Sequence, residues 1–286
     1  MIRLAAGRAR AEVSPKMGAG LVGLFVEGRA VLRPWSGQVA DGPFALAMNL
    51  LAPFSNRISG GFSLSGTTYC MAPNLNGEPF PIHGDAFQRE WRVSAQDVAS
   101  ATLTLPDGDF APFRYCAQVT YDMTPTALKV RLSLTSRAAM TLPYGLGFHP
   151  WFLRDSDTRL RFHATGYWPE DSHHLPSTTA PVALPAHRNF ADWAALPADW
   201  VNAGFNGWDG VAHVAQGPAA VSVVLRSDLS TAILYSPSSV ADFFCFEPVS
   251  HPVDAHNLPG KPGLNLLAPG ETLTAEMTLE WTCDND

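Results

Sequence analysis

The chain has 286 residues, of which 46% are apolar and only 16% are charged, against roughly 25% charged residues in an average protein. Its 24 Pro and 23 Gly argue against a helical bundle, since a Pro inside a helix costs about 3 kcal/mol, while 16 Phe and 8 Trp argue against disorder. The formal charge of −7 lacks the basic excess of a nucleic-acid-binding protein, so we expect no nucleic-acid partner.

The N-terminal segment and the cysteines indicate where the protein works. Residues 1–28 contain no apolar core of a signal peptide, and the chain has no run of 18 apolar residues, so we expect no membrane association. The cysteines lie far apart and form no Cys-x-x-Cys pair: Cys70, Cys116, Cys245 and Cys283. Such spacing suits reduced, buried thiols better than disulfides or a zinc site. We therefore expect a cytoplasmic protein.

The strongest periodic signal along the chain repeats every two residues. Apolar and polar side chains alternate over residues 118–123, 128–135, 159–164 and 272–282. This alternation is typical of strands with one buried and one exposed face, as in antiparallel sheets. No Gly-x-Gly-x-x-Gly follows a strand, which argues against a nucleotide-binding α/β fold. The sequence predicts an all-β fold, a large antiparallel β-sandwich.

The segments between these stretches carry turn signals. Ser59-Gly60-Gly61 and Pro106-Asp107-Gly108 predict turns. Residues 192–196 predict a short helix, and the Pro-rich residues 173–185 predict a long loop within one domain. No repeat or shift in composition marks a boundary, so we expect a single domain over residues 1–286.

Four segments that we expect outside strands concentrate polar groups: residues 56–61, 81–85, 145–152 and 243–252. In the last of these, Glu247 is the single acidic residue of an aromatic, Pro-bounded run. Burial of such a carboxyl is costly and raises its pKa, as a general base requires.

Structural explanations remain open for the same residues. His83 or His149 could be a hydrogen-bonded core residue, Arg57 could form a structural ion pair, and Glu247 could accept from turn amides. His251, Asp254 and His256 could in principle ligate a metal. Their spacing matches no metal motif, so we expect no metal site. No Gly-x-Ser-x-Gly motif is present to indicate a serine hydrolase.

Taken together, these segments resemble the aldose 1-epimerase (mutarotase) family. The matching pieces follow the family's order: Asn56-Arg57-Ile58, His83-Gly84, Gly147-Phe148-His149-Pro150-Trp151-Phe152, Phe205-Asn206-Gly207-Trp208-Asp209-Gly210, Phe246-Glu247-Pro248 and Asp254-Ala255-His256-Asn257. The resemblance implies a galactose mutarotase-like supersandwich with a sugar cleft across one sheet. It implies interconversion of the α and β anomers of a small free aldose without metal, nucleotide or other cofactor. It leaves the sugar and the oligomeric state open.

The resemblance also implies a role for each polar residue. Glu247 would be the general base and His149 the general acid. His83 would hydrogen-bond near the ring oxygen and C1, and Arg57 would hold a sugar hydroxyl. The chemistry needs these groups, because ring opening removes a proton from the anomeric hydroxyl while the ring oxygen gains one.

At one expected sugar-binding position the sequence departs from the family pattern. Many members of the family carry an Asp three residues before a Phe, and counting back from Phe205 that position is Asn202. An amide brings no negative charge, so Asp209 is the alternative. Trp151 and Trp208 could present apolar faces to the sugar or could pack in the core.

Other functions remain open at this stage. A mutarotase for a phosphorylated or sulfonated hexose would need a second basic group beside Arg57, with Arg89 and Arg92 as candidates. A carbohydrate-binding sandwich without turnover could keep the same cleft. A glycosidase is disfavoured because it needs two carboxyls, and only Glu247 has the required setting.

Overall fold

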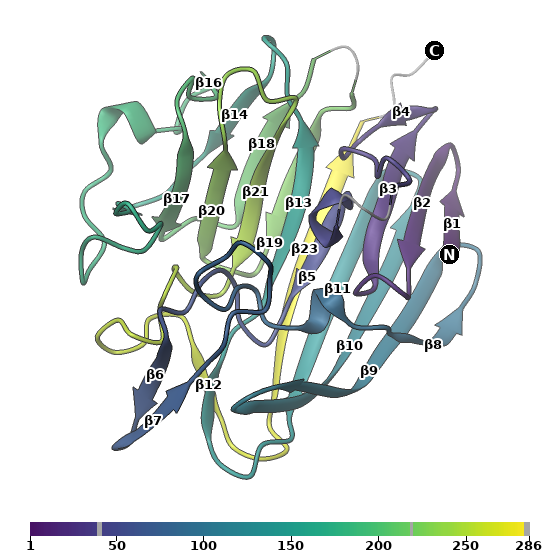
Figure 1. The fold of residues 1–286 in the computed structure, drawn as a ribbon. Coiled ribbons are helices and arrows are strands. Elements are labelled where there is room, and N and C mark those ends of the chain that lie inside the picture. The colour runs from purple at the N-terminus through teal and green to yellow at the C-terminus, as the bar shows by residue number, and fades with distance from the viewer. Residues whose placement is uncertain (39–41, 218–219, 283–286) are drawn as a thin grey trace.

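The structure is a computed structural model of the chain, and it describes residues 1–38, 42–217 and 220–282. Within these residues, antiparallel strands form two large sheets that pack face to face around a continuous apolar core (Figure 1). The predicted all-β antiparallel sandwich is therefore confirmed. We call the sheets the cleft sheet and the back sheet.

The cleft sheet carries the N-terminal strands at one edge and the candidate site near its middle. In spatial order it contains β1 (Ile2–Ala6), β2 (Ala9–Ser14), β3 (Gly20–Val26), β5 (Met48–Leu51), β13 (Gly147–Leu153), β21 (Phe243–Val249), β20 (Thr231–Ser236), β17 (Val201–Asn206) and β15 (Gly166–Trp168), with β4 (Arg29–Ala30) paired to β3. The strands that meet at the middle come from distant parts of the chain.

The back sheet is built from the strands with the clearest alternation. Its spatial order is β16 (Ala194–Ala195), β14 (Arg159–Phe162), β18 (Val211–Ala215), β19 (Val223–Ser227), β23 (Thr272–Trp281), β11 (Ala127–Ser136), β10 (Phe113–Thr124), β9 (Ser100–Phe110) and β8 (Arg92–Gln96). Each predicted alternating stretch falls on one of these strands to within two residues. In β11, for example, Leu128, Val130 and Leu132 are fully buried between Lys129 and Arg131, which are exposed.

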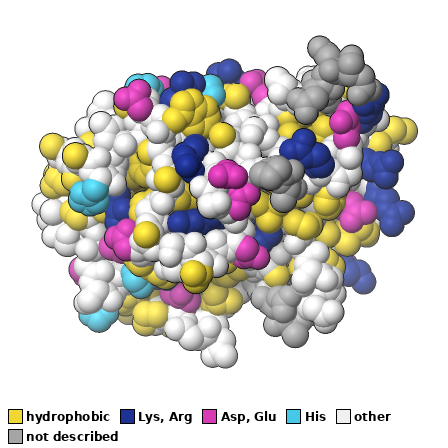
Figure 2. All heavy atoms as spheres, turned by 90° about the horizontal axis from the view of Figure 1, so that it is seen from above, with side chains coloured by type: hydrophobic (Ala, Val, Ile, Leu, Met, Phe, Trp, Pro, Cys, Tyr) yellow, Lys and Arg dark blue, Asp and Glu magenta, His cyan; other side chains and the backbone are white. Residues whose placement is uncertain are grey.

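Short elements complete the described chain. They are the paired strands β6 (Gly61–Leu64) and β7 (Thr67–Cys70), the paired strands β12 (Leu142–Tyr144) and β22 (Asn265–Leu267), and the single 3-10 turns η2 (Pro43–Ala45), η3 (Ala86–Gln88) and η4 (Ala186–Arg188). Within the described ranges, no helix is long and apolar enough to cross a membrane. Figure 2 shows one face of the molecule, on which charged side chains of both signs are interspersed among uncharged ones.

Two local predictions are wrong. Pro106-Asp107-Gly108 does not form a turn but lies inside β9, where the register with β10 shifts by one residue between Tyr115 and Ala117. Pro is tolerated there because a β-bulge needs no N–H from that residue. Residues 192–196 form no helix, and β16 pairs with the edge of β14 instead. A five-residue helix is too short to offset the cost of nucleation.

Two of the four polar segments are also strands, contrary to expectation. β13 and β21 lie side by side in the middle of the cleft sheet, and nearly all of their residues are buried. A strand that is buried on both faces has no reason to alternate, which is why period-two patterning missed them. The predicted loop over residues 173–185 is confirmed, with isolated bridges only at Pro176 and Val182.

The described cysteines are free thiols, but they are not all buried. Cys245 is buried in β21, Cys116 is half-buried and Cys70 is exposed on β7. Cys283 lies outside the described residues.

A buried carboxyl ties the segment that carries His83 to the back sheet. The Tyr115 hydroxyl on β10 donates a 2.5 Å hydrogen bond to Asp85, which also accepts from the backbone N–H of Asp109. Burial raises the pKa of Asp85, and the Tyr115 hydrogen bond partly offsets this. The contact therefore fixes the position of the chain two residues after His83.

We expect Tyr115→Phe to lower the free energy of unfolding by about 1–3 kcal/mol, because it leaves the Asp85 carboxyl short of its best donor. Urea unfolding at pH 7 measures this. Tyr69→Phe is the control, since the Tyr69 hydroxyl lies in an exposed contact with the Met140 sulfur. Equal losses in the two variants would show that the Asp85 contact does not hold this segment.

Candidate active site

A cleft of about 440 Å³ lies over the middle of the cleft sheet. Its floor is made by side chains of β13, β21, β20 and β17, namely His149, Trp151, Glu247, Tyr235 and Asn202. Its walls come from loops, and include Phe44, Asn56, Arg57, Gly77, Glu78, Pro79, Ile82, His83, Ser172, His173, His174 and Trp200. Six of the eight predicted site residues thus converge here: Glu247, His149, His83, Arg57, Asn202 and Trp151.

The floor holds a close pair of ionisable side chains. β13 and β21 pair Gly147 with Val249 and Trp151 with Cys245, a register that places His149 opposite Glu247. The His149 Nε2 and Glu247 Oε1 atoms are 3.4 Å apart, and the two side chains are 7% and 2% exposed. Within the described part of the chain, neither Nδ1 of His149 nor Oε2 of Glu247 has a hydrogen-bond partner. Buried polar atoms left free in this way are suited to meet the polar groups of a ligand.

Burial shifts the pKa values of this pair in opposite directions. Desolvation raises the pKa of Glu247 to about 8, and the positive charge of Arg57 opposes the shift. Desolvation also lowers the pKa of His149 to about 3. Both shifts have the same cause, because a dry site disfavours the charged form of each group. At neutral pH these shifts favour a proton on Glu247 and a neutral imidazole at His149.

His83 is held in one tautomer by the backbone. The N–H of Asn56 donates to His83 Nδ1 over 2.9 Å, and the N–H of His83 donates to the Asn56 carbonyl over 3.0 Å. Burial, reinforced by His149, lowers the pKa of His83 well below its usual value, so the ring is neutral. A neutral ring that accepts at Nδ1 carries its proton on Nε2. His83 can therefore donate a hydrogen bond to a ligand.

The turn that presents His83 depends on a glycine. His83 and Gly84 both have positive φ, at 58° and 67°. A Cβ at Gly84 would collide with the Ala52 carbonyl oxygen and with the Pro53 ring. The His83-Gly84 pair therefore lets the chain pass against the end of β5 with the imidazole turned to the cleft.

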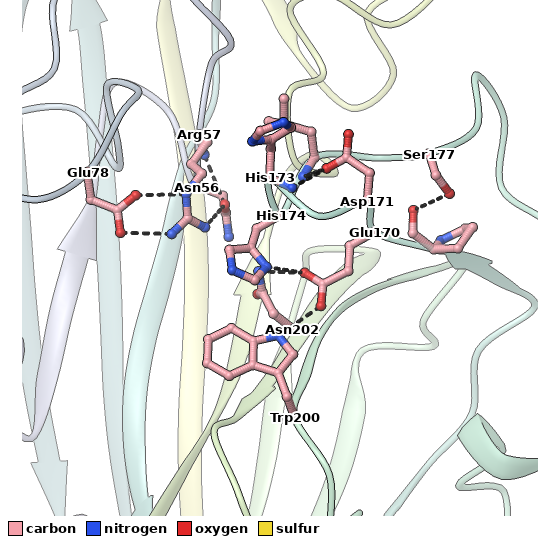
Figure 3. A network of polar contacts seen from close by, with 12 residues as sticks. Asn56, Arg57, Glu78, Glu170, Asp171, His173, His174, Ser177, Trp200 and Asn202 are labelled. Carbon is pink, nitrogen blue, oxygen red and sulfur yellow. Dashed lines mark hydrogen bonds and ion pairs between the residues drawn. The ribbon is translucent and has the colours of Figure 1, made fainter.

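Arg57 both forms an ion pair and lines the cleft. Its Nε and Nη2 donate to the two carboxylate oxygens of Glu78, each over 2.9 Å, in a bidentate pair that Figure 3 shows beside Asn56. The Asn56 Oδ1 accepts from the Arg57 N–H over 3.0 Å and lies 3.5 Å from Nη1. The guanidinium is thus fixed in position and largely neutralised by Glu78.

The opposite wall is organised around Glu170. Its Oε1 accepts from Trp200 Nε1 over 2.8 Å, and its Oε2 accepts from His174 Nδ1 over 3.0 Å and from Asn202 Nδ2 over 3.3 Å (Figure 3). The three donors line the cleft, whereas Glu170 stands behind them. The Trp200 indole also stacks on His174 with the ring centroids 4.9 Å apart.

The structure separates the remaining candidates. Trp151 stacks on His149 at 4.9 Å between ring centroids and lines the cleft. Trp208 is a core residue, with its indole N–H bonded to the Val211 carbonyl and its ring against Phe246. Asp209 is exposed outside the cleft, where it caps the backbone N–H of Val211. Neither Trp208 nor Asp209 is therefore placed to touch a ligand in the cleft.

The three residues considered as possible metal ligands form hydrogen bonds within the protein. His251 accepts from the N–H of Ser55, and His256 donates to the Pro143 carbonyl. Asp254 accepts from the N–H and hydroxyl of Ser59. Among the described residues, no group of three or more His, Cys, Asp or Glu side chains is placed to hold a metal ion.

Arg89 and Arg92, the candidates for a basic group that would bind a phosphate or sulfonate beside Arg57, do not line the cleft. Arg89 donates to the Asp107 carbonyl, and Arg92 is exposed on β8 at the edge of the back sheet.

Sequence reasoning missed Glu78 and Glu170. Glu78 stands between Gly77 and Pro79, a lone charge in a Gly- and Pro-bounded segment. The same kind of setting drew attention to Glu247, so a signal was present. Glu170 lies in a loop and is brought to Trp200 and Asn202 by the pairing of β15 with β17, which no local pattern reveals.

Comparisons with known proteins give consistent matches. A family model described as aldose 1-epimerase matches residues 1–280. The chain is 34% identical over 242 residues to the uncharacterised protein YphB of Escherichia coli (strain K12), covering 81% of this chain and 83% of that protein.

Solved structures resemble the whole chain. A crystal structure from Escherichia coli K12, provisionally named as an aldose 1-epimerase, superposes with a TM-score of 0.90 at 31% identity and covers 98% of each chain. A galactose mutarotase-like protein from Clostridium acetobutylicum has a TM-score of 0.85 at 20% identity, with coverage of 97% of this chain and 93% of that one. The second likeness concerns the fold alone.

The raised pKa of Glu247 predicts how stability depends on pH. Between pH 6 and 9 the unfolded chain carries this carboxyl ionised, while the folded protein must ionise it in a dry site with a pKa of about 8. The free energy of unfolding then falls as the pH rises through this window. We expect Glu247→Gln to remove this loss, so its free energy of unfolding relative to that of wild type should increase by about 3 kcal/mol from pH 6 to pH 9. Urea unfolding of both proteins at the two pH values measures it, and a constant difference would contradict the shift.

Proposed function

This chain belongs to the aldose 1-epimerase family, and we propose that it interconverts the α and β anomers of a free, uncharged aldose by acid–base opening and closure of the sugar ring. The observation that supports this most directly is the 3.4 Å separation of His149 Nε2 and Glu247 Oε1 on the floor of the cleft. The two oxygens of a cyclic hemiacetal share one carbon, so an acid and a base that act on them together must lie near each other.

In the proposed reaction, the Glu247 carboxylate takes the proton of the anomeric hydroxyl while protonated His149 gives its proton to the ring oxygen. The bond between C1 and the ring oxygen breaks, and C1 becomes a carbonyl carbon. Rotation about the C1–C2 bond turns the other face of the carbonyl to the hydroxyl. Ring closure reverses both proton transfers and restores the pair.

The pair shares one proton throughout this cycle. Ring opening ends with the proton on Glu247 and a neutral His149, which is the state that desolvation favours. A cyclic sugar instead needs the proton on His149. Hydroxyl groups of the bound sugar supply hydrogen bonds to the Glu247 carboxylate and so favour its charged form. Because the two side chains are adjacent, the proton needs no other carrier.

The surrounding groups position the sugar. The His83 Nε2–H donates toward the oxygens at C1, where negative charge develops during transfer. Arg57 donates to a hydroxyl, and the Trp151 ring covers the apolar side of the sugar. The proposed setting is the cytoplasm, with the free sugar as the partner.

A neutral sugar fits the charges of the cleft better than an anionic one. The Arg57 guanidinium is already paired with Glu78 through two hydrogen bonds. Arg89 and Arg92, the candidates for an anion site, are held outside the cleft. Among the described residues that line the cleft, a phosphate or sulfonate would therefore meet no Lys or Arg other than the paired Arg57, and it would face Glu78.

We expect Glu247→Gln to lower the rate constant of anomer exchange by about 10²–10⁴-fold, because the amide keeps the shape of the side chain but cannot take a proton. Anomer-resolved proton NMR on freshly dissolved α-galactose and α-glucose measures the exchange. Glu276→Gln on the back sheet is the control, since Glu276 pairs with Lys129 and Arg131 far from the cleft.

Full activity of Glu247→Gln would remove Glu247 from the mechanism. Sugar binding by wild type without any acceleration of exchange would favour the alternative of a carbohydrate-binding sandwich without turnover.

We also expect the wild-type protein to act on galactose or glucose with a kcat/KM at least about tenfold higher than on the 6-phosphates, because an unpaired anion would be buried beside Glu78. Coupled or NMR rate measurements at low and high salt provide the comparison. A preference for the phosphorylated sugar that weakens as salt rises would instead support a mutarotase for charged sugars.

A further inference from the structure

We propose that Glu170 supplies from behind the cleft wall the negative charge that Asn202 lacks, and so makes the Asn202 amide a fixed acceptor for a sugar hydroxyl. Glu170 is in this sense a positioning residue, since it acts through Asn202 and does not touch the sugar. The inference rests on the proposed function, because it concerns how the same cleft selects its sugar.

The geometry begins with the carboxylate of Glu170. It accepts from donors on the loop that follows β15 and on the start of β17: His174 Nδ1, Trp200 Nε1 and Asn202 Nδ2. Glu170 is only 22% exposed, and the Asn202 residue is 7% exposed. The Glu170 carboxylate therefore links the loop that follows β15 to the start of β17.

The chemistry of these partners fixes the orientation of the amide. A carboxylate can only accept hydrogen bonds, so the NH₂ group of Asn202 must face Glu170. The other atom of the amide, Oδ1, is then turned away from Glu170 and left for the cleft that Asn202 lines. Donation to a negative charge also polarises the amide and strengthens Oδ1 as an acceptor. The Glu170–Asn202 pair thus presents to a ligand what a carboxylate at the wall would present, an oxygen that only accepts.

The same reasoning applies to His174. Because a carboxylate can only accept, the His174 Nδ1 donates to Glu170. The Glu170 side of the cleft therefore presents the Asn202 acceptor, while the other side carries the Arg57 donor (Figure 3). A sugar bound between them has to donate from its hydroxyls on one side and accept on the other.

The register of the floor places this acceptor away from the reacting carbon. Asn202 on β17 lies opposite Tyr235 on β20, and Ile233 on β20 lies opposite Glu247 on β21. Asn202 is thus two strands from Glu247, about 10 Å between the strand backbones. Its partner is therefore a hydroxyl on a ring carbon remote from C1. Loss of the acceptor should weaken sugar binding and leave the proton transfers almost unchanged.

Moving the carboxylate from position 170 to position 202 tests the proposed role of Glu170. Glu170→Gln should raise KM for galactose by about tenfold with kcat within about threefold, because the new amide removes the charge that holds the Asn202 NH₂ group. Asn202→Asp should raise KM similarly, since two carboxylates would then face each other. The double variant E170Q/N202D should return KM to within about threefold of wild type, because one charge is again present and the glutamine can donate to it.

Glu276→Gln, on the back sheet, controls for a Glu-to-Gln change as such, and thermal unfolding shows whether each variant is folded. A double variant no better than the worse single variant would overturn the proposal, as would Glu170→Gln with an unchanged KM. A purely structural role for Glu170 predicts no rescue, because the double variant would carry both defects.

Galactose affinity measured by calorimetry on the same four proteins separates this proposal from the proposed function. If wild type binds galactose without accelerating exchange, the proposed activity fails, and the affinities still decide the role of Glu170 by the same pattern of loss and rescue. If wild type binds no aldose, both proposals fail.

Discussion

Exclusion of water from the floor of the cleft is the condition on which the rest of the site depends. It raises the pKa of Glu247 and lowers that of His149, and so allows two adjacent side chains to share one proton at neutral pH. In water the carboxyl would stay ionised and the pair would lose this exchange. Phe44 and Trp151 contact His149 and keep this region apolar. The fold also keeps His149 and Glu247 away from water, because it places them on β13 and β21 in the middle of the cleft sheet.

Strands and loops divide the work of the site. Paired strands set the separation of His149 and Glu247, because their register is fixed by backbone hydrogen bonds. Loops carry the wall residues such as Arg57 and His174, and half-buried carboxylates hold these in place. Glu78 fixes Arg57 on one wall, and Glu170 fixes the opposite wall. The reacting pair is thus rigid by construction, whereas the walls depend on polar contacts that differ more easily between relatives.

The sequence predicted the back sheet well and the cleft sheet poorly, for a physical reason. Strands with one wet face alternate, as in β11 and β23, but β13 and β21 are buried on both faces and carry no such period. The aromatic, Pro-bounded setting of Glu247 drew attention to it, and resemblance to a family gave His149 and Glu247 their roles. Trp208 packs in the core and Asp209 lies outside the cleft, because β17 ends at Asn206 before the chain reaches either residue. Glu170 was missed because only the folded chain brings it to Asn202.

The pairing of a carboxylate at position 170 with an amide at position 202 constrains how this wall of the cleft can evolve. An ancestor with an acidic residue at position 202 and a neutral one at 170 differs from this chain by two exchanges. Either exchange made first leaves a wall with no carboxylate or with two, and on our proposal both intermediates should bind sugar less well. The two positions are thus expected to change together across lineages, and a relative that carries either residue without its counterpart should have shifted to a different sugar.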